Sequence, residues 1–121
     1  RFKEFKKQKE KPIIVAMIEN IQSVKKLEEI ISVKGLDSIL IGPYDLSASM
    51  GITGKFNNLK FKKTIQKIKN IAKKFKVPLG IHIVEPNYKN LKKFINSGYQ
   101  FIPYCTDTVL INSAIKNSFK K

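Results

Sequence analysis

Apolar blocks along this chain alternate with blocks of helical periodicity. Residues 13–18 form a continuous, partly β-branched apolar run, which is typical of a strand buried on both faces. Asn20 follows at once and is a suitable N-cap for a helix over residues 21–33, in which apolar residues recur at helical spacing. Gly35 is a natural stop for that helix. The first complete unit of the pattern is therefore a strand followed by a helix.

The same strand-then-helix pattern recurs three more times. The second strand ends abruptly at Gly42-Pro43, and a short segment then runs to Gly51. The clearest helix follows a turn-rich loop, because its apolar residues alternate by three and four while lysines occupy its other face. The remaining strands are expected at residues 38–41, 79–84 and 101–103, and the remaining helices at 59–76, 88–97 and 107–119.

Four strand–helix units in a row predict an α/β fold with a parallel sheet and helices outside it. Right-handed crossovers place all the strand C-termini at one end of such a sheet, where α/β barrels and open α/β sheets have their active sites. The polar residues expected at that end are Glu19, Asp45, His82, Glu85 and Asp107.

Length and composition narrow the class of protein. The chain has 121 residues, which allows one modest domain, and its 42% hydrophobic content argues against disorder. No apolar run approaches the ~20 residues of a membrane span, and no signal-peptide pattern is found, so we expect a cytoplasmic protein with no membrane partner. The single Cys105 excludes an internal disulfide and suits a reducing compartment. We interpret it as a small residue near a strand end, not as a nucleophile.

The formal net charge of +15 raises the alternative of a basic α/β module that binds nucleic acid or anionic surfaces. The positions of the lysines argue against it, because they lie on helix faces opposite the apolar stripe. We therefore do not expect a nucleic-acid partner. The predicted strand ends and turns fall in three lysine-free stretches, residues 35–54, 77–88 and 94–115.

Glu19 and Asp45 each follow an apolar strand directly, on consecutive strands. Adjacent parallel strands lie about 5 Å apart, so two carboxylates at neighbouring strand ends can share one hard divalent cation. The competing interpretation is that one carboxylate only stabilises a helix N-terminus. The spacing slightly favours the metal site, with Mg²⁺ or Mn²⁺ as the ion.

The sequence Met-Ile-Glu-Asn at 17–20 and the segment 35–51, which contains Gly-Pro-Tyr-Asp-Leu-Ser, resemble the HpcH/HpaI aldolase family. These are the class II, metal-dependent pyruvate aldolases, such as 4-hydroxy-2-oxoheptanedioate and 2-dehydro-3-deoxyglucarate aldolases. The resemblance extends over nearly the whole chain and is weaker in residues 80–86 and 98–102. It implies a (β/α)8 barrel about twice as long as this chain.

Residues 1–121 would then be a single partial domain, the C-terminal half of the barrel with its strands five to eight. Residues 1–11 would be the remnant of a preceding helix. The resemblance further implies a homo-oligomer, often a hexamer, with the helix at 107–119 in the contacts between subunits. Because a half barrel has open sheet edges and an uncovered apolar flank, we expect the segment alone to self-associate.

The resemblance assigns the metal to Glu19 and Asp45, with Co²⁺ as a further option. It assigns the carboxylate of pyruvate to the Gly42-Pro43 turn, where the backbone amides of Tyr44 and Asp45 would bind it. The bulky Tyr44 would narrow the pocket for the aldehyde partner.

His82 is expected in the same pocket as a lining residue first, as a core histidine second and as a base third. Ser47 and Ser49 have no base partner in view, so we interpret both as hydroxyls that bond within a local turn.

The implied enzyme is a carbon–carbon lyase that splits a 4-hydroxy-2-oxo acid into pyruvate and an aldehyde. In the family, an arginine and a histidine that complete the site belong to the other half, so this segment alone should be inactive. A related alternative is the citrate-lyase β or malyl-CoA lyase branch, which shares the fold and the use of a metal.

Overall fold

The computed structural model describes residues 11–119 and is built on a three-stranded parallel sheet. The strands lie in chain order, β1 (Val15–Ile18), β2 (Ser38–Ile41) and β3 (Leu79–Ile81), with Met17 opposite Leu40 and Leu40 opposite Gly80. The helices are α2 (Ile21–Lys25), α3 (Leu27–Ile31), α4 (Pro43–Ser49), α5 (Leu59–Phe75), α6 (Tyr88–Asn96) and α7 (Asp107–Ser118). The predicted α/β fold with a parallel sheet is confirmed, while the expected helix remnant at the N-terminus lies almost wholly outside the described residues.

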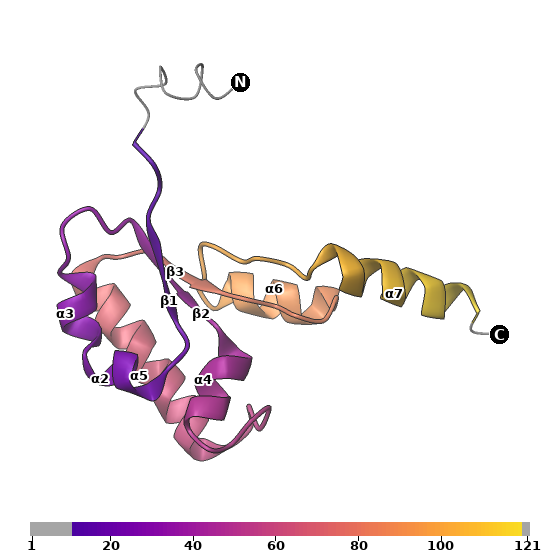
Figure 1. Cartoon of the computed structure of the whole chain (residues 1–121), viewed down its shortest axis with the longest axis horizontal. Helices are drawn as coiled ribbons and strands as arrows, with labels where there is room; N and C mark the ends of the chain where they lie inside the picture. The colour runs from indigo at the N-terminus through magenta and orange to yellow at the C-terminus, as the bar shows by residue number, and fades with distance from the viewer. Residues whose placement is uncertain (1–10, 120–121) are drawn as a thin grey trace.

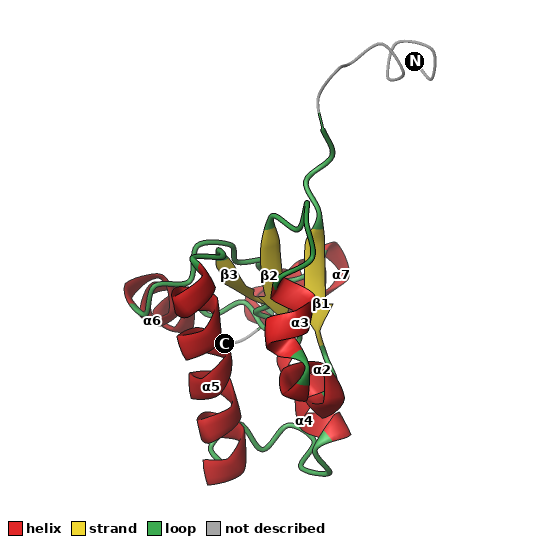
Figure 2. Cartoon of the chain, turned by 90° about the vertical axis from the view of Figure 1, so that its left-hand side faces the viewer, coloured by secondary structure: helices red, strands yellow, loops and turns green. Residues whose placement is uncertain are grey.

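One face of the sheet carries the core. Helices α2, α3 and α5 lie together on that face in both views (Figures 1 and 2). Alternate strand residues point into the space between sheet and helices, since side chains switch faces along a strand. Ile18, Ile39 and Ile41 are almost completely buried there and pack against Leu27 and Ile68 from the helices.

The opposite face has no such cover among the described residues. Met17, in the middle of β1, is 48% exposed, although its neighbour Ile18 is 1% exposed. Leu40 and Phe101 approach each other on this face, because a Cβ built on Gly80 would lie 3.0 Å from an atom of each side chain. Helix α7 extends away from the helix-covered side and buries none of its residues (Figure 1).

Several of the predicted elements differ from the structure. The strands expected at residues 13–18 and 79–84 are shorter, Val15–Ile18 and Leu79–Ile81. The helix expected over residues 21–33 is divided at Lys26, whose backbone (φ −101°, ψ 19°) leaves the helical range. Val24 and Leu27, on either side of the break, are both buried, so the core-facing side of the segment is kept.

The continuous fourth strand expected at residues 101–103 is wrong. This segment makes only two isolated parallel bridges, Gly80 with Phe101 and Ile83 with Tyr104. Between them stands Pro103, which accepts a hydrogen bond from Ile83 but has no N–H to donate, so a regular ladder cannot continue through it. Only three of the four expected strand–helix units therefore have a full strand.

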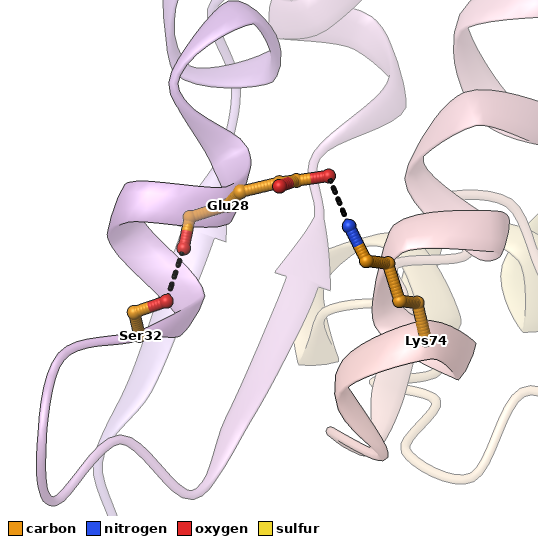
Figure 3. Close-up of polar contacts among 3 residues, drawn as sticks. All are labelled: Glu28, Ser32 and Lys74. Atoms are coloured by element: carbon orange, nitrogen blue, oxygen red, sulfur yellow. Dashed lines mark hydrogen bonds and ion pairs between the residues drawn. The ribbon is translucent and has the colours of Figure 1, made fainter.

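A polar contact joins α3 to α5 on the outer surface (Figure 3). Lys74 Nζ lies 3.1 Å from Glu28 Oε1, and the Ser32 hydroxyl donates to the carbonyl of Glu28 at 2.7 Å. Both charged side chains are more than half exposed, so the ion pair contributes little to stability. No helix in residues 11–119 is long and apolar enough to cross a membrane.

Candidate functional site

The side chain of Glu19 lies across the end of the neighbouring strand. Glu19 follows β1 directly and is half-buried, and Gly42 follows β2. A Cβ built on Gly42 would stand 2.8 Å from Glu19 Cγ and 3.0 Å from Glu19 Oε1. Real side chains do not approach so closely, so the absence of a side chain at Gly42 is what allows this position of Glu19.

Asp45 reaches the same end of the sheet from the first turn of α4. This helix begins with Pro43, after Gly42 as its N-cap. Gly42 offers no capping side chain, and the first amides of a helix have no partner within it. Within residues 11–119, the N–H groups of Tyr44 and Asp45 have no hydrogen-bond partner and can bind an acceptor.

The two carboxylates have the oxygen chemistry of a hard divalent cation site. Neither Glu19 nor Asp45 makes a side-chain hydrogen bond or ion pair within residues 11–119. The same residues contain no cluster of three or more His, Cys, Asp or Glu that could hold a metal. A cation held by this pair would complete its coordination with water and substrate oxygens, which Mg²⁺ commonly does. The space over Gly42 that admits the Glu19 side chain fits this role.

Tyr44 turns toward α5. Its ring meets Phe56 edge-on at 4.9 Å between ring centroids, and Phe56 lies 5.4 Å from Phe61 of α5. Ser47, fully buried beneath this loop, donates to the carbonyl of Tyr44 and accepts from the N–H of Gly54. The loop after α4 thus holds the Tyr44 ring in a row of aromatic side chains.

A cavity of about 550 Å³ lies beside this row. Pro43, Tyr44, His82 and Glu85 line it, with apolar side chains of α5 and β3. The structure therefore brings together Tyr44 and His82 from separate strand ends. Glu19, Gly42 and Asp45 do not line this cavity, so the predicted site residues form two groups that share the turn at 42–45.

The cavity has a buried phenol and basic groups at its wall. Burial raises the pKa of Tyr99 to about 12. Lys69 Nζ lies 5.2 Å from the centre of the Tyr99 ring and donates to the carbonyl of Ser97 at 3.0 Å. Lys62 and Lys93 also line the cavity, which gives it a cationic rim.

Cys105 is a partly buried free cysteine beside the interrupted fourth strand. Desolvation raises the pKa of its thiol, which disfavours the thiolate that a nucleophile requires. Its N–H donates to the carbonyl of Ile83 at 2.7 Å, next to the second bridge of the interrupted strand.

The expectation that both serines of the motif bond only locally is wrong for Ser49. Its hydroxyl donates to the carbonyl of Leu46 at 2.7 Å and also accepts from the N–H of Ile21 at 2.9 Å, in a different helix. Nothing in the local sequence signals this contact, because it depends on how α2 and α4 are placed by the paired strands.

The matching family model, described as HpcH/HpaI aldolase/citrate lyase, covers residues 1–114. Curated relatives include a 5-keto-4-deoxy-D-glucarate aldolase of Escherichia coli O157:H7, 32% identical over 111 residues, with 89% of this chain and 43% of the relative covered. A protein of the same name from Citrobacter koseri is 32% identical, with 42% of its length covered. The chain spans less than half the length of these relatives.

Solved structures share the fold. An HpcH/HpaI aldolase from Desulfitobacterium hafniense superposes with a TM-score of 0.81 at 22% identity, over 98% of this chain and 46% of that one. The citrate synthase SbnG gives 0.74 at 24% identity, over 88% of this chain and 42% of that one. At these identities the likeness concerns the fold alone, which is an α/β arrangement like that of the barrel-forming aldolases.

Proposed function

Because this chain belongs to the HpcH/HpaI aldolase/citrate lyase family, we propose that it forms part of a metal-dependent aldolase. The enzyme would split a 4-hydroxy-2-oxo acid into pyruvate and an aldehyde, and would also catalyse the reverse reaction. The observation that carries this proposal is the position of the Glu19 side chain over Gly42, at the turn that presents Asp45.

Glu19 and Asp45 would hold the divalent ion, with Mg²⁺ or Mn²⁺ favoured over Co²⁺. When bound, such an ion supplies positive charge that polarises the 2-oxo group and stabilises the enolate. The exposed position of Asp45 and the half-buried position of Glu19 support a site that substrate can reach.

The turn after β2 would orient the substrate. The free N–H groups of Tyr44 and Asp45 suit the carboxylate of the 2-oxo acid, since amides in the first turn of a helix favour an anion. Pro43 cannot donate a hydrogen bond, and Gly42 adds no side chain that would compete for these amides. The substrate would therefore be held at both its carboxylate and its 2-oxo oxygen.

The aldehyde part of the substrate would extend toward Tyr44 and His82. Both line the cavity beside α5, and the aromatic row fixes the ring of Tyr44. We assign His82 a lining role and Tyr44 a role in limiting the size of the aldehyde.

In the cleavage direction, a base takes the proton of the 4-hydroxyl and the C3–C4 bond breaks. The electron pair of the broken C3–C4 bond passes to the enolate of pyruvate, and the aldehyde leaves. C3 is then protonated. The base and an arginine near the 2-oxo group are expected in the other half of the enzyme. Glu19 and Asp45 would thus complete their chemistry only within the longer protein.

The assignment of this chain to one half of a (β/α)8 barrel remains a prediction. We propose that β1, β2, β3 and the interrupted segment at residues 101–104 correspond to strands five to eight of a (β/α)8 barrel, with residues 1–121 as one partial domain. The remaining strands would cover the exposed face around Met17, and the full enzyme would be a cytoplasmic homo-oligomer.

The test uses the full-length protein with Glu19→Gln and Asp45→Asn, each of which keeps size and removes charge. Pyruvate release from a 4-hydroxy-2-oxo acid should fall at least about a hundredfold in each variant and should stop with EDTA. Glu29→Gln, at an exposed position of α3, is the matched control and should stay near wild type. Activity that survives both changes and EDTA would contradict the assignment.

The family description also names citrate lyase, which supports a second candidate with a CoA thioester substrate. The same proteins assayed with malyl-CoA distinguish the two candidates. Activity on the thioester without activity on the hydroxy-oxo acid would favour this second function.

A further inference from the structure

Ser49 links the segment after Glu19 to the helix that presents Asp45. Its hydroxyl accepts from the Ile21 N–H at 2.9 Å and donates to the Leu46 carbonyl at 2.7 Å. Because the donated hydrogen is committed to its own helix, the oxygen is left oriented as an acceptor toward α2. The contact is partly buried and joins residues 28 positions apart.

A second link joins the same two segments at their start. The N–H of Gly42 donates to the carbonyl of Ile18 at 3.3 Å. The bond between Gly42 and Ile18 comes before Glu19 in the first segment and before Asp45 in the second. The bond between Ile21 and Ser49 comes after these carboxylates in both segments. Glu19 and Asp45 therefore stand between two cross-links that fix one segment against the other.

We propose that Ser49 is a positioning residue for the metal site, and this inference rests on the function proposed above. Ser49 does not touch the ion or the substrate. It sets the placement of α2 against α4 and so holds the Glu19 and Asp45 carboxylates at the separation that one divalent cation requires. Loss of such an outer contact commonly weakens metal binding about ten- to a hundredfold.

Within residues 11–119, the Ser49 hydroxyl is the acceptor that the Ile21 N–H has. The Ile21 N–H is the first amide of α2 and has no partner within that helix. The side chain of Asn20, the N-cap, already accepts from the N–H of Gln22 at 2.8 Å. Ser49→Ala would leave the Ile21 amide unpaired, whereas Ser49→Thr keeps an oxygen that can accept from it.

The experiment measures Mn²⁺ binding by the full-length protein with isothermal titration, together with the midpoint of thermal unfolding. Ser49→Ala should raise the Kd for Mn²⁺ about ten- to a hundredfold, and Ser49→Thr should keep it close to wild type.

Ser38→Ala is the matched control. Ser38 is buried and also joins two segments, since its hydroxyl donates to the carbonyl of Pro78 at 2.9 Å, but it lies at the opposite end of β2. The Ser38→Ala change should lower the midpoint of thermal unfolding without changing the Kd for Mn²⁺.

Three results would overturn the inference, and they differ in meaning. If the wild-type protein binds Mn²⁺ and the Ser49→Ala variant binds it with the same Kd, only the role of Ser49 is contradicted. A wild-type protein that binds no Mn²⁺ would remove the metal site and the role of Ser49 together. Equal weakening by Ser49→Ala and Ser38→Ala would also count against it, because general loss of stability would then explain both.

Discussion

At the scale of single residues, Gly42 decides where the Glu19 carboxylate can lie. Its backbone (φ −94°) is open to any residue, so the glycine is not needed for the turn itself. What it provides is space, because any Cβ would overlap the Glu19 side chain. The residue therefore has a role in the candidate site that its conformation alone does not reveal.

Gly42→Ala should separate metal binding from stability. The Glu19 side chain is flexible and can move aside, so the free energy of unfolding should change by less than about 1 kcal/mol. The displaced carboxylate should bind Mn²⁺ at least about tenfold more weakly. Urea unfolding and titration calorimetry on the same sample measure the two effects. A variant that unfolds more easily yet binds Mn²⁺ normally would contradict this account.

The sequence allowed part of the candidate site to be predicted at this scale. Acidic residues that follow apolar strands were recognisable, since strand ends gather at one edge of a parallel sheet. The space at Gly42 and the contact from Ser49 were not recognisable, because both depend on distances between residues of separate segments. Such contacts have no periodicity for a sequence pattern to display.

At the scale of elements, the most irregular part of the fold is the segment after β3. Phe101 stands close to Gly80, whose missing side chain permits the approach, and Pro103 interrupts the pairing. Apolar runs predicted the three regular strands, but a short run that contains proline was also taken for a strand. The outcome follows the rule that proline removes a ladder hydrogen bond.

Gly80→Ala should destabilise the protein, in contrast to Gly42→Ala. A Cβ at this position would lie 2.6 Å from the carbonyl oxygen of Phe101, which is backbone and cannot rotate away. The pairing of the fourth segment with β3 should therefore be forced apart, at a cost of about 1–3 kcal/mol. Chemical unfolding measures this loss, and faster amide exchange at Ile81 would locate it. An unchanged unfolding midpoint would show that the segment yields without strain.

At the scale of the whole molecule, the helices cover one face of the sheet and leave the other open. The open face presents Met17 and Phe101, which are 48% and 42% exposed, while Leu40 on the same face is buried. The chain spans less than half of its curated relatives, so the proposed longer protein has the residues to cover this face.

The chain of residues 1–121 made alone should self-associate. Exposed apolar surface and open sheet edges both favour contacts between copies. Met17→Glu places a charge on the open face and should shift sedimentation toward the monomer. Val33→Glu changes an apolar residue that is 62% exposed and is the control. It should leave the sedimentation unchanged. A cooperative monomer without either change would contradict the partial-domain proposal.

The order of the strands has a consequence for how the protein is made. β1, β2 and β3 are neighbours in the sheet in the order in which they are synthesised. Each strand that leaves the ribosome, at roughly 5–20 residues per second, can therefore pair with the strand made just before it. Paired residues lie 23 positions apart for β1 and β2 (Val15 with Ser38) and 40 apart for β2 and β3 (Ile39 with Leu79). The entropy cost of closing a loop grows only slowly with its length. The sheet can grow during translation by adding one unit at a time, without waiting for the C-terminus.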